Sequence, residues 1–222
     1  VDTAESDTED DFVGNVDKLV ASDCTLIIGV GFHLEPAVHQ SALQHPDRNF
    51  AMIDTTFTDG TDETVLKNGR PLLFNASEAA FLAGYTSAAM SKTGKVATFG
   101  GAQIPAVAVF MDGFADGVKA YNEAKGTSVQ VLGWDKETQT GAFTDSFDDQ
   151  SLGLQQAQQF IAQGADIIMP VAGPVGMGAA AAAKADGKTL IVGVDSDWYE
   201  TNPQYSSIIL TSVMKEIGAA VE

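Results

Sequence analysis

Leu190-Ile-Val-Gly-Val-Asp195 is an almost wholly apolar run that ends on a carboxylate. A short continuous apolar run fits a strand that is buried on both faces, as the strands of parallel sheets are. Similar runs recur along the chain, and each is followed by a stretch with helical spacing. They cover residues 24–29, 50–54, 71–75, 95–100, 129–134, 165–170 and 207–211. This alternation of strand and helix predicts an α/β fold with parallel sheets.

Glycine and proline punctuation midway along the chain divides the alternation between two lobes. The loop Gly100-Gly-Ala-Gln-Ile-Pro105 separates two strand-rich halves, and about eight strands suit two small sheets as well as one large sheet. We expect the chain to enter the second lobe just before Lys95 and to return near Tyr205. The predicted first lobe therefore comprises residues 1–92 and 205–222, and the second lobe comprises residues 93–204.

The composition excludes several classes of protein. The 222 residues include 30 acidic and 12 basic side chains, a net charge of −18, so DNA, RNA and anionic lipid would repel the chain. Hydrophobic residues make up 45% of the chain, which is enough for a core and excludes wholesale disorder. The single cysteine, Cys24, excludes an internal disulfide and a zinc site built on cysteines. No apolar stretch reaches the ~18 residues that a membrane span needs.

Asp195 is the residue that we expect to bind a ligand. In parallel α/β sheets, ligands bind beyond the carboxyl ends of the strands, and Asp195 ends an apolar strand there. Its carboxylate can accept hydrogen bonds from two neighbouring hydroxyls of a sugar, although a solvated loop position is the alternative. Aromatic residues near the strand ends could stack on a flat ring or belong to the core: they are Phe32, Trp134, Phe143 and Trp198. This combination suits a nucleoside or a sugar.

Other candidate chemistries find little support in the chain. Gly29-Val-Gly31 lacks the third glycine of a dinucleotide fingerprint, so we assign Gly31 only to the close approach of a small ligand to the backbone. His33, His39 and His45 are spaced by six residues and would point in different directions on a helix, so no metal is expected. The motifs of nucleophilic catalysis are missing. We therefore expect no catalytic residue and no cofactor.

Several stretches, taken together, carry a family likeness. Their residues are 26–32, 45–54, 78–84, 113–117, 141–145, 164–168, 172–176, 193–197 and 211–215. In their order and spacing the chain resembles the basic membrane protein family, the nucleoside-binding lipoproteins of ATP-binding-cassette (ABC) importers, which include a purine nucleoside receptor. The likeness covers nearly the whole chain.

The resemblance implies a type I periplasmic-binding-protein fold, with two doubly wound parallel-sheet lobes joined by a hinge and closing on a nucleoside. By this analogy Asp195 and Lys215 would hold the ribose hydroxyls, and Phe143 would stack on the base. The remaining residues that the analogy places at the ligand are Phe32, Asp54, Gly173 and, at the head of the crossover helix, Glu78. An ABC permease is the implied partner, and the implied location is extracytoplasmic, at the cell surface or in the periplasm.

The chain also departs from the family pattern. We expect it to be truncated at both ends, without the first β-α unit and without the C-terminal return. The cysteine that carries the lipid anchor would lie upstream of Val1, so Cys24 is not that residue. Trp198 stands where the family usually has a glutamine.

The leading hypothesis is thus a receptor that captures a nucleoside, with a purine expected, and delivers it to a permease. A sugar receptor of the same fold is the main alternative, with Trp134 and Trp198 stacking on a pyranose. An α/β enzyme that uses Asp195 or Asp197 on a nucleoside is a weaker alternative. A regulatory domain would need a basic helix-turn-helix, which the chain lacks.

Overall fold

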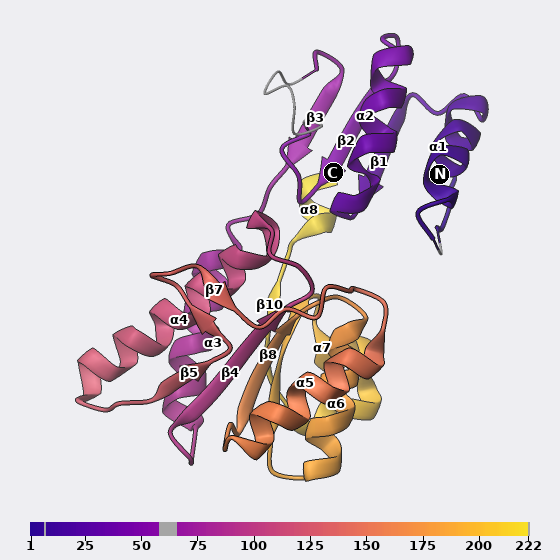
Figure 1. Ribbon diagram of the computed structural model, residues 1–222. Helices are drawn as coiled ribbons and strands as arrows, with labels where there is room; N and C mark the ends of the chain where they lie inside the picture. The colour runs from indigo at the N-terminus through magenta and orange to yellow at the C-terminus, as the bar shows by residue number, and fades with distance from the viewer. Residues whose placement is uncertain (7, 58–65, 222) are drawn as a thin grey trace. The chain divides into compact units, whose positions relative to one another are not determined.

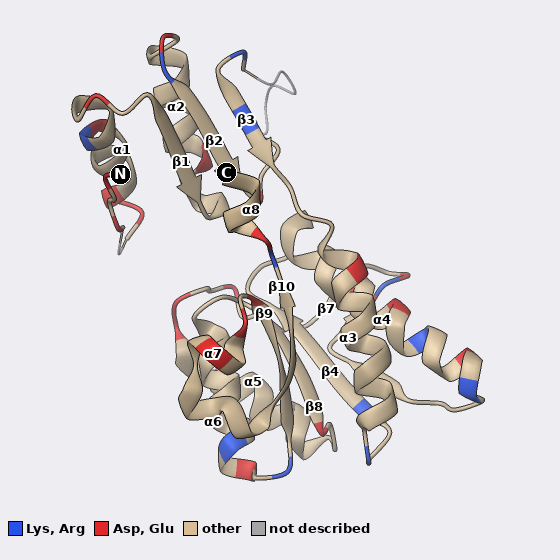
Figure 2. Ribbon diagram, turned by 180° about the vertical axis from the view of Figure 1, so that it is seen from behind, with Lys and Arg blue, Asp and Glu red and all other residues tan. Residues whose placement is uncertain are grey.

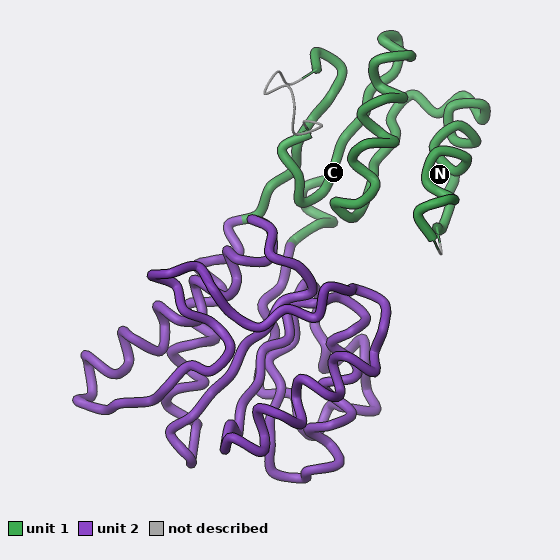
Figure 3. The backbone as a smooth tube through the Cα atoms, viewed as in Figure 1, with its two compact units in different colours: residues 1–74, 216–222 green, residues 75–215 purple. Residues whose placement is uncertain are grey.

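The computed structural model describes residues 1–6, 8–57 and 66–221 (Figure 1). The chain forms two compact units, one from Val1–Phe74 with Glu216–Glu222 and one from Asn75–Lys215 (Figure 3). Each unit has its own parallel sheet. The α/β class predicted from the alternation of apolar runs and helices is therefore confirmed.

The first unit contains a three-stranded sheet in the order β1-β2-β3. Its strands are β1 (Leu26–Val30), β2 (Asn49–Ile53) and β3 (Gly69–Leu72). Its helices are α1 (Asp11–Ala21), the 3-10 turn η1 (Phe32–Leu34), α2 (Glu35–Gln44) and α8 (Ile217–Val221). A small core lies between the sheet and the helices, centred on Ile27, Val38, Phe50 and Met52.

The second unit contains a five-stranded sheet in the order β10-β9-β8-β4-β5, with every pairing parallel. Its strands are β4 (Lys95–Gly100), β5 (Gln130–Leu132), β8 (Ile167–Val171), β9 (Leu190–Asp195) and β10 (Ile209–Met214). The helices are α3 (Ala76–Met90), α4 (Pro105–Lys125), α5 (Gln150–Ala162), α6 (Val175–Asp186), α7 (Trp198–Thr201) and the 3-10 helix η2 (Pro203–Ile208).

The central strands of this sheet are buried on both faces, as their apolar sequences predict. Every residue of β8 is buried, and so are Ile191 to Val194 of β9. The crossover through α4 runs from β4 to β5, whereas the crossover through α6 runs in the other direction, from β8 to β9. Right-handed crossovers that run in opposite directions place their helices on opposite faces of the sheet. Both faces are thereby covered.

The division into units differs from the lobe boundaries expected from the sequence, 92/93 and 204/205. The helix α3 belongs with the second unit because it packs against α4 at glycine contacts. A Cβ on Gly84 would lie 2.0 Å from the carbonyl oxygen of Phe114, and one on Gly117 would lie 2.0 Å from that of Phe81. The strand β10 belongs there because it pairs with β9. The unit boundaries therefore fall at 74/75 and 215/216.

A two-stranded hairpin, β6 (Trp134–Asp135) with β7 (Thr140–Gly141), is held against α4 by hydrogen bonds. The Oδ1 atom of Asp112 accepts from the indole Nε1 of Trp134 at 2.9 Å and from Nε2 of Gln139 at 3.0 Å. One helical turn later, Asp116 Oδ2 pairs with Lys136 Nζ at 2.5 Å. This hydrogen bond is the main reason that the pKa of Lys136 is raised above its usual 10.5.

Substitution of Asp112 tests how the hairpin is held. Trp134 is only 6% exposed, and Asp112→Ala removes the acceptor of its indole N–H. An unpaired buried donor lowers the free energy of unfolding by about 1–3 kcal/mol. We expect urea unfolding to show a loss of that size. Asp116→Ala is the matched control, because it breaks an ion pair whose two side chains are each 43% exposed, which is worth at most about 1 kcal/mol. Equal losses in the two variants would contradict this account.

Candidate ligand-binding site

The carboxyl edge of the second unit's sheet gathers the ends of four parallel strands. These ends are Gly100 of β4, Val171 of β8, Asp195 of β9 and Met214 of β10. Ligands of parallel α/β sheets bind at this edge because the loops after the strands leave a crevice there.

Asp195 and Lys215 meet at this edge. The backbone N–H of Lys215 donates to the carbonyl of Asp195 at 3.0 Å, which continues the β9–β10 pairing by one residue. Their side chains form an ion pair, with Lys215 Nζ 2.8 Å from Asp195 Oδ1. The lysine side chain is only 8% exposed, whereas the carboxylate is 46% exposed. The carboxylate therefore neutralises a buried ammonium and still presents acceptor capacity to solvent.

Asp195 has a backbone conformation that is unusual for a residue with a side chain. Its φ of 69° lies in the left-handed region, which non-glycine residues seldom adopt. Such conformations persist where the surrounding structure enforces them, and they are concentrated at functional sites. The ion pair and a left-handed backbone thus coincide at the residue chosen from the sequence.

Phe143 is fixed beside the end of β4. Gly100 N–H donates to the carbonyl of Ala142, and Thr144 N–H donates to the carbonyl of Gly100, both at 3.0 Å. The Phe143 ring meets the Trp134 ring edge to face, with centroids 5.9 Å apart. A Cβ on Gly100 would lie 2.7 Å from the Phe143 ring, so only glycine allows the ring to lie against the strand end.

A second ring at this edge, Phe147, was not among the residues proposed from the sequence. A Cβ on Gly101 would lie 2.4 Å from its ring, and one on Gly173 would lie 3.8 Å from it. The carbonyl of Phe147 also accepts from the N–H of Val175, at the start of α6, at 3.2 Å. The only signal in the sequence was a second phenylalanine four residues after Phe143 in a loop rich in aspartate.

The two tryptophans belong to the core, so the hypothesis that they stack on a ligand is wrong. Trp134 is 6% exposed and Trp198 is 4% exposed. The Nε1 of Trp198 donates to the carbonyl of Val194 at 2.8 Å, and its ring packs where a Cβ on Gly176 or Gly193 would lie. Large aromatic rings near strand ends can fill the gap between a sheet and a short helix just as well as they can face a ligand.

The surroundings of this edge are acidic (Figure 2). The loop before α5 contains Asp145, Asp148 and Asp149, and α7 is preceded by Asp197. Asp149 caps α5 by accepting from the N–H and hydroxyl of Ser151, which lowers the pKa of its carboxyl below 3.8. An acidic rim disfavours anions and accepts neutral ligands that offer hydroxyl donors.

The sequence-proposed residues of the first unit lie at the carboxyl edge of its own sheet. Gly31, with a φ of 110°, and Phe32 follow β1, and Asp54, with a φ of 69°, follows β2. The N–H of Asp54 donates to the carbonyl of Leu72 at 3.0 Å. Close by in sequence, the buried hydroxyl of Thr55 donates to the carboxylate of Glu35.

Glu78 and Gly173 are the remaining residues that were proposed from the sequence as ligand-binding. Glu78 is exposed in the first turn of α3, with its N–H donating to the carbonyl of Asn75 at 3.3 Å. Gly173 follows β8 with a φ of 52° and is therefore a strand-end residue of the second unit. The second unit thus brings together Asp195 and Lys215, and it places Phe143 and Gly173 at the same sheet edge.

Within residues 1–6, 8–57 and 66–221, no three or more His, Cys, Asp and Glu side chains are grouped so that they could hold a metal ion. In the same part of the chain, every helix is too short or too polar to cross a membrane.

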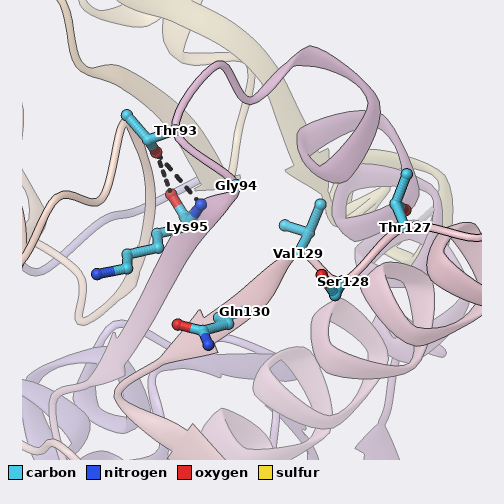
Figure 4. Close-up of a pocket in the computed structure, with 7 residues that line it drawn as sticks. All are labelled: Thr93, Gly94, Lys95, Thr127, Ser128, Val129 and Gln130. Atoms are coloured by element: carbon cyan, nitrogen blue, oxygen red, sulfur yellow. Dashed lines mark hydrogen bonds between the residues drawn. The ribbon is translucent and has the colours of Figure 1, made fainter.

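A hollow at the opposite edge of the sheet contains none of the predicted residues (Figure 4). It lies at the amino ends of β4 and β5, and its lining consists of Thr93, Gly94, Lys95, Thr127, Ser128, Val129 and Gln130. The hydroxyl of Thr93 bonds to the backbone N–H and carbonyl of Lys95, so this side chain is engaged in the turn itself. The amino ends of parallel strands are not where ligands of such sheets bind.

Comparisons with known proteins agree with the fold. The chain is 27% identical to the "ABC transporter nucleoside-binding protein BmpA" of Lactococcus lactis subsp. cremoris, over 98% of this chain and 61% of that protein. It is 31% identical to "Basic membrane protein A" of Borreliella burgdorferi, over 95% of this chain and 57% of that protein. The chain therefore spans less than two thirds of the length of these relatives.

Among solved structures, an ABC transporter solute-binding protein from Aeropyrum pernix K1 matches with a TM-score of 0.77 and 27% identity. The match covers 97% of this chain and 58% of that one. The predicted fold, of the type I periplasmic-binding-protein kind, is confirmed. The model of the family "ABC transporter substrate-binding protein PnrA-like" (Bmp) matches residues 1–222. The chain belongs to this family of ABC transporter substrate-binding proteins, as the resemblance of its motifs predicted.

Proposed function

We propose that this chain binds a nucleoside, with a purine nucleoside preferred, as part of a solute receptor that delivers its ligand to an ABC permease. The observation that carries the proposal is the ion pair between Asp195 and Lys215 at the carboxyl edge of the sheet. Membership of a substrate-binding family and the printed name of the nucleoside-binding relative support the same conclusion.

The ion pair suits the ribose of a nucleoside. A carboxylate has about four acceptor positions, and one of these is taken up by the ammonium of Lys215. The others can accept the neighbouring 2′ and 3′ hydroxyls, while the ammonium can donate to one hydroxyl oxygen. Because the ion pair and the backbone hydrogen bond hold Asp195 and Lys215 together, little ordering of these side chains is left for the binding step.

The base requires a flat apolar surface beside the ion pair. Phe143 and Phe147 supply two rings on the segment that follows the β6–β7 hairpin, and both lie against strand-end glycines. Stacking on aromatic rings is tolerant of the base, and it favours the larger surface of a purine.

We also propose ligand contacts for Gly31, Phe32, Asp54, Glu78 and Gly173.

Receptor function involves no bond making or breaking, which is the difference from the enzyme hypothesis. Nucleoside cleavage would need a positioned acid, base or metal to stabilise the departing base. Asp195 is engaged with Lys215, and Asp197 caps α7 by accepting from the N–H of Tyr199 at 2.9 Å.

We propose that the whole protein acts outside the cytoplasm, anchored by a lipid.

The contribution of Asp195 is tested by isothermal titration of the protein with guanosine, inosine, adenosine, cytidine and ribose. We expect one-to-one binding of a nucleoside, weakened about tenfold by Asp195→Asn and on the order of 100-fold by Asp195→Ala, because charge-assisted hydrogen bonds are lost. Asp197→Asn is the matched control, since it removes the same charge two residues away and keeps an acceptor for Tyr199. It should change the affinity less than twofold.

The same titration separates the alternatives. Binding of ribose or another sugar in preference to every nucleoside would replace the nucleoside receptor with a sugar receptor. Release of free base would show an enzyme. Equal weakening by Asp195→Asn and Asp197→Asn would mean that only the overall charge matters and would contradict the role of the ion pair.

The aromatic rings are tested with Phe143→Leu and Phe147→Leu. Each stacked ring contributes about 1–3 kcal/mol to binding of a base, so we expect each variant to weaken guanosine binding about tenfold. Binding of ribose should stay the same, because ribose offers no base to stack. Unchanged guanosine affinity in both variants, measured by titration, would show that these rings do not contact the base.

A further inference from the structure

Phe110 lies directly beside the ammonium of Lys215. This residue belongs to the second turn of α4 and is only 1% exposed. The Nζ atom of Lys215 lies 5.0 Å from the centroid of its ring. That distance is within the range in which the negative face of an aromatic ring attracts a cation.

Three elements therefore meet at one charged atom. β9 supplies the carboxylate of Asp195, β10 leads into Lys215, and α4 supplies the Phe110 ring. With 8% of its side chain exposed, Lys215 has lost most of the water that would stabilise its charge. The carboxylate replaces that water on one side and the ring replaces it on another.

We infer that Phe110 is a positioning residue for ligand binding, one that holds the Lys215 ammonium at Asp195 before the ligand arrives. This inference rests on the proposed function, because it concerns the same ion pair. A lysine side chain has several rotatable bonds, and fixing it costs rotamer entropy. The ring limits the ammonium to the position from which it contacts both the carboxylate and an incoming hydroxyl.

Phe110→Leu tests the inference, and the chain offers a matched control. Phe114 lies one helical turn later on α4 and is also fully buried in the same core. Phe110→Leu removes a ring beside Lys215, whereas Phe114→Leu is a core change of the same size. We expect Phe110→Leu to weaken guanosine binding about three- to thirtyfold and Phe114→Leu to change it less than twofold, measured by titration. If Phe110→Leu does not fold, Phe110→Met removes the ring with a more adaptable side chain.

A double-mutant cycle with Lys215→Met shows whether Phe110 acts through the lysine. Once the ammonium is absent, Phe110→Leu should have no further effect on affinity. If Phe110→Leu and Lys215→Met weaken guanosine binding independently, so that their fold-changes multiply in the double variant, the inference is overturned. Equal affinities of Phe110→Leu and the wild-type protein would also overturn it. A wild-type protein that binds neither a nucleoside nor ribose would overturn the proposed function and this inference together.

Discussion

The parallel pairing of β10 with β9 is the constraint on which the candidate site depends. It sets Lys215 beside Asp195, first through the backbone hydrogen bond of 3.0 Å and then through the ion pair of 2.8 Å. A slip of the register by one residue would turn the lysine to the other face of the sheet. The buried residues Ile191 to Val194 of β9 and the buried Val213 of β10 resist such a slip, so packing in the core fixes the geometry of the charged groups.

Glycines at the strand ends have a complementary role. Gly100, Gly101 and Gly173 leave room where a Cβ would meet or approach a phenylalanine ring, so aromatic surface lies directly against the sheet edge. The hairpin that precedes these rings is tied to α4 by Asp112 and Asp116. The same helix carries Phe110, so α4 supports both the aromatic part and the charged part of the candidate site.

The strands of the two parallel sheets were predictable because a short continuous apolar run is typical of a buried strand. Asp195 was predictable because a carboxylate at the end of such a run faces solvent at the sheet edge. Lys215 was chosen only by family resemblance, since its position depends on the pairing of strands that are separated in sequence. Phe147, the hairpin and the burial of both tryptophans depend on tertiary packing, which periodicity does not report. The same holds for α3, whose assignment to the second unit depends on its glycine contacts with α4.

We propose that Asp195 and Lys215 together hold the ribose of a nucleoside, and a crystal structure of the protein with guanosine would test this. Both ribose hydroxyls should donate to the Asp195 carboxylate, with Lys215 Nζ within hydrogen-bond distance of one of them. A guanosine whose ribose lies away from this ion pair, with the pair unchanged, would show that the pair does not bind the ribose.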